Sequence, residues 1–274
     1  MKETSIISGI FPDEVSEALY EALLAIYPES RNKGSIDIRL PKEDPRIAQG
    51  LKVLNEWGFS PRDRHRTAEP NEFTLMIRRL YDKEDYENAD YLVPKPQECL
   101  GSATSRSANG LLKLEDEDLK MNEDIGYSTW AWIVVSTQIK ERIEQSGLKR
   151  IILRPTEIVG PRRKRFVGHF WELTSDLRLP SLNSHCQLTT NNGLPFAGDY
   201  DQGCHYFETP YDQPEFYYNA NDIAAIKPFD LALTQERFGI REWVAEPSLI
   251  ASKQFYEFCV ENKLKMNWMP VRIE

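Results

Sequence analysis

The chain has 274 residues, of which 41% are hydrophobic and 28% charged, the proportions of an ordinary folded protein. That length can bury a sizeable core, so neither disulfides nor a metal is required to hold the fold. The formal net charge of −9 argues against a general nucleic-acid binder and a polybasic membrane binder, because both need clustered positive charge.

The first 90 residues predict a small N-terminal module of alternating helices and strands. Apolar residues recur at helical spacing in two segments and alternate in two others. Asp44 followed by Pro45 is typical of a helix start, because aspartate caps the first turn and proline needs no amide partner there. In chain order we expect a helix at 12–27, a strand at 35–40, a helix from Asp44 that ends near Gly58, and a strand at 73–77.

Residues 91–126 predict a long connection between domains. They contain Pro94 and Pro96, a serine- and glycine-rich stretch at 101–110, and then a dense run of acids. Acidic groups raise the rate at which a protein meets a basic partner. The candidate partner-binding residues are therefore Glu115, Asp116, Glu117, Asp118, Glu123 and Asp124.

A weak internal repeat is the most informative pattern of the sequence. Each copy predicts a strand end, a serine that caps a short helix, and an alternating strand, and the closing strands carry Pro155 and Pro270 one position out of register. We therefore expect residues 127–274 to form a larger mixed-sheet domain with a pseudo-repeated strand–helix–strand unit, in a protein of the α+β class. The alternative is a chance match between two generic units. At a constant offset of 116 residues, the identical pairs are Ser136/Ser252, Gln138/Gln254, Glu141/Glu257, Leu148/Leu264 and Lys149/Lys265.

Two histidine–cysteine pairs offer candidate metal ligands. His185-Cys186 and Cys204-His205 supply two imidazoles and two thiolates, which is the ligand set of a tetrahedral zinc site. Adjacent ligands on one strand point to opposite faces, so a compact site would need a bent backbone. Unliganded loop residues without a cofactor are the favoured interpretation, and zinc is the alternative.

A strand that ends in serine, an amphipathic helix and a strand that ends near proline resemble the immunity proteins of bacterial polymorphic toxin systems. The double-CxxCG motif family of myxobacteria is one such group, and the resembling segments are 132–155, 170–180 and 229–273. The resemblance implies a non-enzymatic protein that neutralises a cognate toxin by direct contact. The chain lacks both CxxCG motifs of that family, and the two histidine–cysteine pairs stand in the corresponding loop.

Two other classes of function stay open. The chain has no GxGxxG, GxxxxGK[ST], HExxH or GxSxG motif, so an enzyme would belong to an unrecognised class. Its site would lie in the loop at 182–214, near Cys204 and His205. The third class is a structural or oligomeric scaffold.

The sequence predicts a cytoplasmic protein that does not bind membranes. Its longest apolar run, at 130–135, is far too short to span a bilayer, and the N-terminus lacks a secretory pattern. Two basic runs, at 62–66 and 162–165, contrast with the acidic segments. Each run is either a solvated loop or a local contact for an anion or RNA, although the net charge makes nucleic-acid binding by the whole chain unfavourable.

Overall fold

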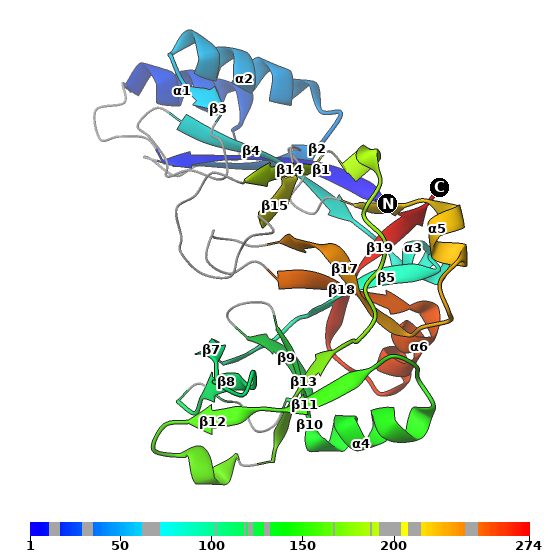
Figure 1. The fold of residues 1–274 in the computed structure, drawn as a ribbon. Helices are drawn as coiled ribbons and strands as arrows, with labels where there is room; N and C mark the ends of the chain where they lie inside the picture. Colours follow the sequence, from blue (N-terminus) through cyan, green and yellow to red (C-terminus); the bar gives the residue numbers. More distant parts are fainter. Residues whose placement is uncertain are drawn as a thin grey trace. The chain divides into compact units, whose positions relative to one another are not determined.

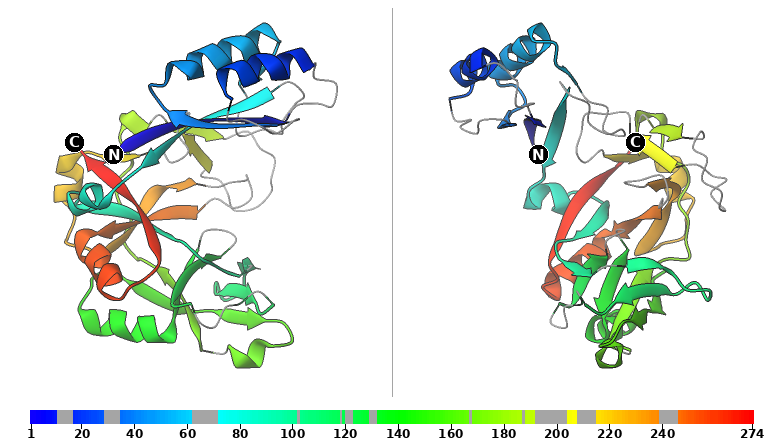
Figure 2. Two further views of the ribbon diagram at one scale, coloured as in Figure 1. Left: turned by 180° about the vertical axis from the view of Figure 1, so that it is seen from behind. Right: turned by 90° about the vertical axis from the view of Figure 1, so that its left-hand side faces the viewer.

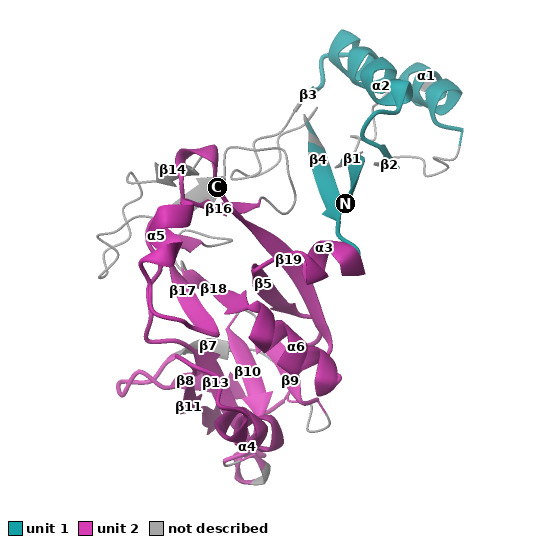
Figure 3. Ribbon diagram, turned by 90° about the vertical axis from the view of Figure 1, so that its right-hand side faces the viewer, with its two compact units in different colours: residues 1–82, 208–214 teal, residues 83–207, 215–274 magenta. Residues whose placement is uncertain are grey.

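The computed structural model describes most of the chain, which is of the α+β class (Figure 1). The described residues form two compact units, coloured differently in Figure 3, and each is described by itself. Unit 1 comprises residues 1–82, and unit 2 comprises residues 83–207 and 215–274. The described residues are 1–10, 17–28, 35–61, 72–101, 103–117, 119, 123–128, 132–166, 168–186, 188–191, 204–207, 215–238 and 246–274.

Unit 1 is a four-stranded sheet with two helices on one of its faces (Figure 2). Its elements are β1 (Lys2–Ile10), α1 (Glu17–Ile26), β2 (Ser35–Pro41), α2 (Pro45–Glu56), β3 (Ser60–Pro61) and β4 (Glu72–Leu80). The strand order is β2-β1-β4-β3, in which β1 is antiparallel to both neighbours and β3 is parallel to β4. The sequence predicted these elements except β1 and β3, and the expected helix start at 12–16 lies outside the described residues.

The second helix of unit 1 begins and ends where its sequence predicts. Asp44 caps α2 by accepting a hydrogen bond from the amide of Arg46 at 2.9 Å, and Pro45 occupies the first turn. Gly58 follows the helix with a φ of 79°, a left-handed conformation that favours glycine. The apolar faces of both helices pack on the sheet in a core that includes Ile7, Leu19, Leu23, Ile38, Leu54 and Phe73.

The described part of unit 2 falls into two sets of elements that correspond to two repeats. The first set is α3 (Lys83–Glu87), β5 (Tyr91–Pro96), β6 (Cys99–Gly101), β7 (Ala103–Arg106), β8 (Leu112–Glu115), β9 (Ile125–Ser128), β10 (Ile133–Ser136), α4 (Thr137–Ser146), β11 (Ile152–Pro155) and β12 (Glu157–Val159). The turn η1 (Arg163–Arg165) leads to the second set, which is β13 (Phe170–Thr174), η2 (Ser184–Cys186), β14 (Leu188–Asn191), β15 (Cys204–Phe207), β16 (Phe216–Tyr218), α5 (Ala220–Ala224), β17 (Leu231–Phe238), β18 (Glu246–Ser252), α6 (Lys253–Glu261) and β19 (Met266–Ile273).

The two repeats have the same strand arrangement. In the first repeat, β10 and β11 lie on either side of β13, and both are antiparallel to it. In the second, β18 and β19 lie in the same way on either side of β5. The outer strands correspond as well: β9 and β17 pair with β10 and β18, while β8 and β16 pair in parallel with β12 and the end of β19.

The first strand of each repeat is inserted into the sheet of the other repeat. β5 opens the first repeat in the chain but lies between β18 and β19, and β13 opens the second repeat but lies between β10 and β11. After each exchanged strand the chain returns to its own repeat, because Cys99 pairs with Tyr127 of β9 and Arg178 pairs with Leu233 of β17. Unit 2 therefore consists of two topologically equivalent repeats that exchange their first strands.

Both serine caps predicted from the sequence are confirmed. The Oγ of Ser136 accepts a hydrogen bond from the amide of Ile139 at 3.3 Å, and the Oγ of Ser252 accepts one from Phe255 at 3.2 Å. The helices that follow, α4 and α6, lie side by side (Figure 3). Their buried faces share one apolar cluster, so the two repeats have a common core.

The prolines of the closing strands are equivalent in the structure although they are one position out of register in the sequence. Pro155 pairs with Trp171 of β13, and Pro270 pairs with Leu92 of β5. Trp171 and Leu92 are equivalent because each also pairs with the residue before the capping serine. The first repeat takes up its extra residue before β11, where Arg150 has a left-handed φ of 63°.

The boundary of the N-terminal unit differs from the expected one. Unit 1 ends at residue 82 rather than 90, and the described part of 91–126, expected as a connection, instead supplies strands β5–β9 to unit 2. The prolines predicted a connection rather than a strand, but the pairing of β5 accommodates them. Its first two residues, Tyr91 and Leu92, pair with β18, whereas Pro94 and Pro96 lie beyond that contact and pair with β19 on one side.

The helix ends of the two repeats offer a matched test of backbone strain. Gly147 after α4 has a φ of 76°, and the equivalent Lys263 after α6 has a φ of 56°. A left-handed conformation costs a non-glycine residue about 1–2 kcal/mol. We expect Lys263→Gly to raise the free energy of unfolding by about 0.5–1 kcal/mol and Gly147→Lys to lower it by about 1–2 kcal/mol. Urea denaturation measures both changes, and a loss of stability in Lys263→Gly would contradict the assignment.

Candidate functional site

The acidic residues expected to bind a partner do not form one exposed surface. Glu117 is exposed and Glu115 is half-buried in β8, whereas Asp116 is completely buried. Glu123 forms an ion pair with Lys265 at 3.2 Å. Asp118 lies outside the described residues.

Asp124, the last of these candidates, belongs to the helix cap of the first repeat. Its carbonyl oxygen accepts from the amide of Ser136 at 2.9 Å, and its Oδ1 accepts from the Ser136 hydroxyl at 3.0 Å. Asp230 makes the same two contacts with Ser252, at 3.1 Å and 2.6 Å. The Asp124 side chain therefore has a structural role at the helix cap. Its equivalence to Asp230 cannot be recognised in the sequence, because the spacing from the aspartate to the capping serine differs between the repeats.

Asp116 is an unusual buried acid. Among the described residues neither carboxylate oxygen has a hydrogen-bond partner, although Oδ1 forms an ion pair with the Nε of Arg162 at 3.9 Å. A Cβ added to Gly160, whose φ is 113°, would lie 2.4 Å from Oδ1, so glycine is required for this close approach. Because the side chain is enclosed, it cannot offer its charge to a docking partner in this conformation.

The described members of the candidate metal site do not share a site. His185 is exposed, and its Nδ1 lies 2.6 Å from Oε2 of Glu274. Cys186 is buried, and its Sγ accepts from the amide of Tyr217 at 3.2 Å. Burial raises the pKa of the Cys186 thiol to about 11, so the thiol is protonated near neutral pH.

The other two candidate ligands, Cys204 and His205, lie in β15, which pairs with β14. Their side chains are not among those that the structure describes. Most of the loop at 182–214, the candidate location of an enzyme site, also lies outside the described residues. Among the described side chains, no group of three or more His, Cys, Asp and Glu residues could hold a metal ion. The zinc site therefore stays a prediction.

A buried ion pair joins β7 of the first repeat to the exchanged strand β13 of the second. Arg106 donates from both terminal nitrogens to the carboxylate of Glu172, at 2.9 Å and 2.6 Å, and its guanidinium lies 5.0 Å from the ring centroid of Trp132. The hydrogen bonds to Glu172 raise the pKa of Arg106, against the opposing effect of burial. The two charges neutralise each other through the paired hydrogen bonds. We therefore interpret the pair as structural rather than as part of a site that acts on a substrate.

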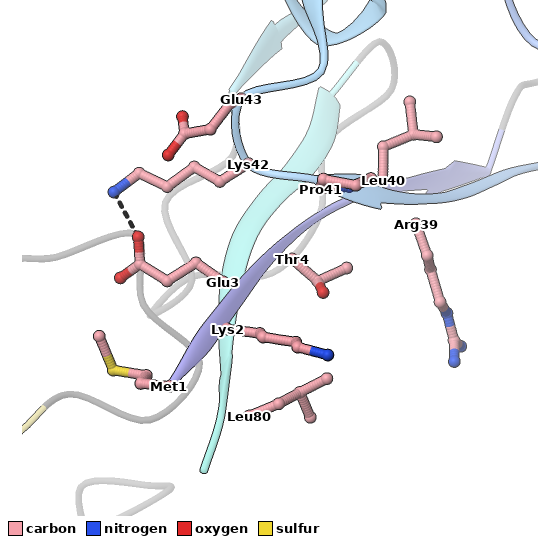
Figure 4. A pocket seen from close by; sticks show the side chains of 10 residues that line it. All are labelled: Met1, Lys2, Glu3, Thr4, Arg39, Leu40, Pro41, Lys42, Glu43 and Leu80. Carbon is pink, nitrogen blue, oxygen red and sulfur yellow. Dashed lines mark hydrogen bonds and ion pairs between the residues drawn. The ribbon is translucent and has the colours of Figure 1, made fainter. Parts of the chain in front are cut away.

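Unit 1 has an open cavity of about 530 Å³ at one end of its sheet (Figure 4). In the figure the ammonium of Lys42 points to Glu3, and the two are 2.6 Å apart. Partial burial acts to raise the pKa of Glu3, but hydrogen bonds from Lys42 and Arg79 outweigh it and keep that pKa below its usual value. The Glu3 carboxylate is thus held charged by two cations.

Four exposed side chains are retained in both repeats without a role in the fold. Gln138 and Glu141 on α4 match Gln254 and Glu257 on α6, and all four are exposed. In the described part of the chain, none of them forms a hydrogen bond or an ion pair. Residues three apart share one face of a helix, so each helix presents its glutamine and glutamate together. We call these four residues the helix-pair face.

Comparison with known proteins adds no identity. No family model matches the chain, and no curated protein matches it either. No helix among the described residues is both long enough and apolar enough to cross a membrane.

Proposed function

We propose that the chain is a non-enzymatic binding protein of the immunity type, which neutralises a cognate protein toxin by direct contact. The helix-pair face supports this proposal. Its four side chains are identical between the repeats, and no contact within the described chain requires them. Exposed polar residues that are retained without a folding role are typical of a binding surface.

Among the other identical pairs, both serines, both leucines and one of the two lysines have local explanations. Ser136 and Ser252 cap the helices, and Leu148 and Leu264 pack against the shared core. Lys265 pairs with Glu123. The glutamine and glutamate pairs are left for contact with another molecule.

Charge favours a basic partner for this surface. Glu141 and Glu257 add exposed carboxylates to Glu117, and the net charge of the chain is −9. Opposite charge accelerates association and disfavours wrong partners. Toxins that act on nucleic acid carry positive charge where they attract phosphate, so an acidic protein can cover that surface.

Identifying a secreted toxin encoded beside this gene and co-expressing it with the chain tests the proposal; a neighbourhood without such a gene would count against it. We expect the full chain to restore growth and to bind the purified toxin. Replacing all four residues of the helix-pair face with alanine is expected to weaken binding by ~10-fold or more. The matched control is Gln145→Ala with Glu261→Ala, at exposed equivalent positions that differ between repeats, and it should bind normally. A toxin that stays active and unbound in the presence of the chain would refute the proposal.

A further inference from the structure

The turn between the two repeats is preformed by contacts with the first repeat. Residues 160–166 follow β12, and the amide of Asp116 donates to the carbonyl of Val159 at 3.0 Å. The guanidinium of Arg162 donates to the carbonyl oxygen of Asp116. Phe166 at the end of the turn is buried, which fixes the other end.

This turn presents a run of cations to solvent. Arg162, Arg163 and Lys164 are all exposed, and 45% of the Arg162 side chain is accessible. In the described chain, Arg163 and Lys164 form no ion pair with an acid. A guanidinium has five N–H donors, so Arg162 keeps donors for a ligand after its bond to Asp116.

The buried carboxylate of Asp116 forms an ion pair with Arg162. Its Oδ1 lies 3.9 Å from the Nε of Arg162, and Gly160 approaches it closely. Among the described residues the carboxylate has no hydrogen-bond partner, and burying it in this way is costly, so a fold that keeps it gains something else. The second repeat has Ala220 at the equivalent position, whose amide makes the matching bond to the carbonyl of Glu274. The acid is therefore not required by the repeat fold.

We propose that Arg162, Arg163 and Lys164 form a binding site for a phosphate-bearing polyanion. Arginine and lysine donors match phosphate oxygens in charge and geometry. The three cations come from one short turn, and Arg162 is already oriented by the Asp116 carbonyl, so little ordering is needed on binding. This site does not depend on the proposed toxin binding, and it lies in a segment that belongs to neither repeat.

Binding of two probes to the full chain tests the site. Inorganic tripolyphosphate represents free phosphate, and a labelled single-stranded RNA represents phosphate esters. We expect at least one of them to bind at low salt, with affinity that falls steeply as salt rises. Each of Arg162→Gln, Arg163→Gln and Lys164→Gln should weaken binding by ~5- to 10-fold and reduce the salt dependence by about one released ion.

The control is Lys227→Gln, which removes one exposed cation from the second repeat. It should leave the affinities for both probes unchanged, because Lys227 lies outside the proposed site. A general effect of net charge would weaken binding in this variant as well. Binding of tripolyphosphate only would identify free phosphate as the ligand, and binding of RNA would identify phosphate esters; both support the site. Failure of both probes to bind, or equal weakening by the control, would overturn it. Thermal melting of each variant checks that the fold is intact.

Discussion

Replacing Arg106 with methionine is expected to lower the free energy of unfolding by about 3–5 kcal/mol. The reason is the partner it leaves behind: Glu172 is 2% exposed, and its carboxylate would remain in the core without a cation. Urea denaturation followed by circular dichroism measures the change. The control Lys52→Met breaks an exposed helical pair with Glu56 and should cost less than about 0.5 kcal/mol.

A double substitution shows whether the loss of stability comes from the unpaired Glu172 carboxylate or from the lost packing of the Arg106 side chain. The exchanged strand β5 has Val93 at the position that Glu172 occupies in β13, and Val93 is also buried. Arg106→Met combined with Glu172→Val should therefore recover most of the stability, to within about 1 kcal/mol of the original chain. A double variant as unstable as Arg106→Met would show that the loss comes from packing rather than from an uncompensated charge.

Asp116→Ala is expected to raise the free energy of unfolding by about 1–3 kcal/mol, although it removes a charged residue near an arginine. The carboxylate is fully buried without hydrogen bonds, whereas the bond from Arg162 goes to the backbone carbonyl and survives the change. The equivalent Ala220 shows that alanine fits this position. Urea denaturation of the variant against the original chain provides the measurement.

Asp124→Ala should change the free energy of unfolding in the opposite direction. Its carboxylate accepts from the hydroxyl that caps α4, so its loss should lower the free energy of unfolding by about 1 kcal/mol.

The Asp116 prediction is contradicted if Asp116→Ala lowers the free energy of unfolding. That result would mean that the buried carboxylate stabilises the fold through its ion pair with Arg162. A destabilising acid retained in a fold that tolerates alanine is typical of a functional position.

Local signals in the sequence predicted much of the fold. The capping serines, the Asp44-Pro45 helix start and the alternation at 73–77 act through neighbouring residues, so they are readable without tertiary structure. β1 was not predicted, although it is flanked by β2 and β4, because its apolar residues lack a clean alternation. The exchange of β5 and β13 is also invisible to a local pattern, because pairing partners lie in the other repeat.

The candidate acidic surface was harder to predict because charge alone does not show where a side chain points. Asp116 and Glu117 are neighbours in the sequence, but the first is enclosed and the second is exposed. Asp124 accepts a hydrogen bond from the hydroxyl of Ser136, twelve residues later, which caps α4. The repeated Gln138/Gln254 and Glu141/Glu257 pairs are visible in the sequence, but their exposure on α4 and α6 is not.

The reciprocal exchange of β5 and β13 has a consequence for how the molecule can change. Two separate copies of one repeat would exchange strands in a symmetric dimer, where every surface alteration appears twice. Joining the copies in one chain removes that constraint. A residue such as Asp116 can then differ from its counterpart Ala220, and the basic turn occurs once, between the two repeats.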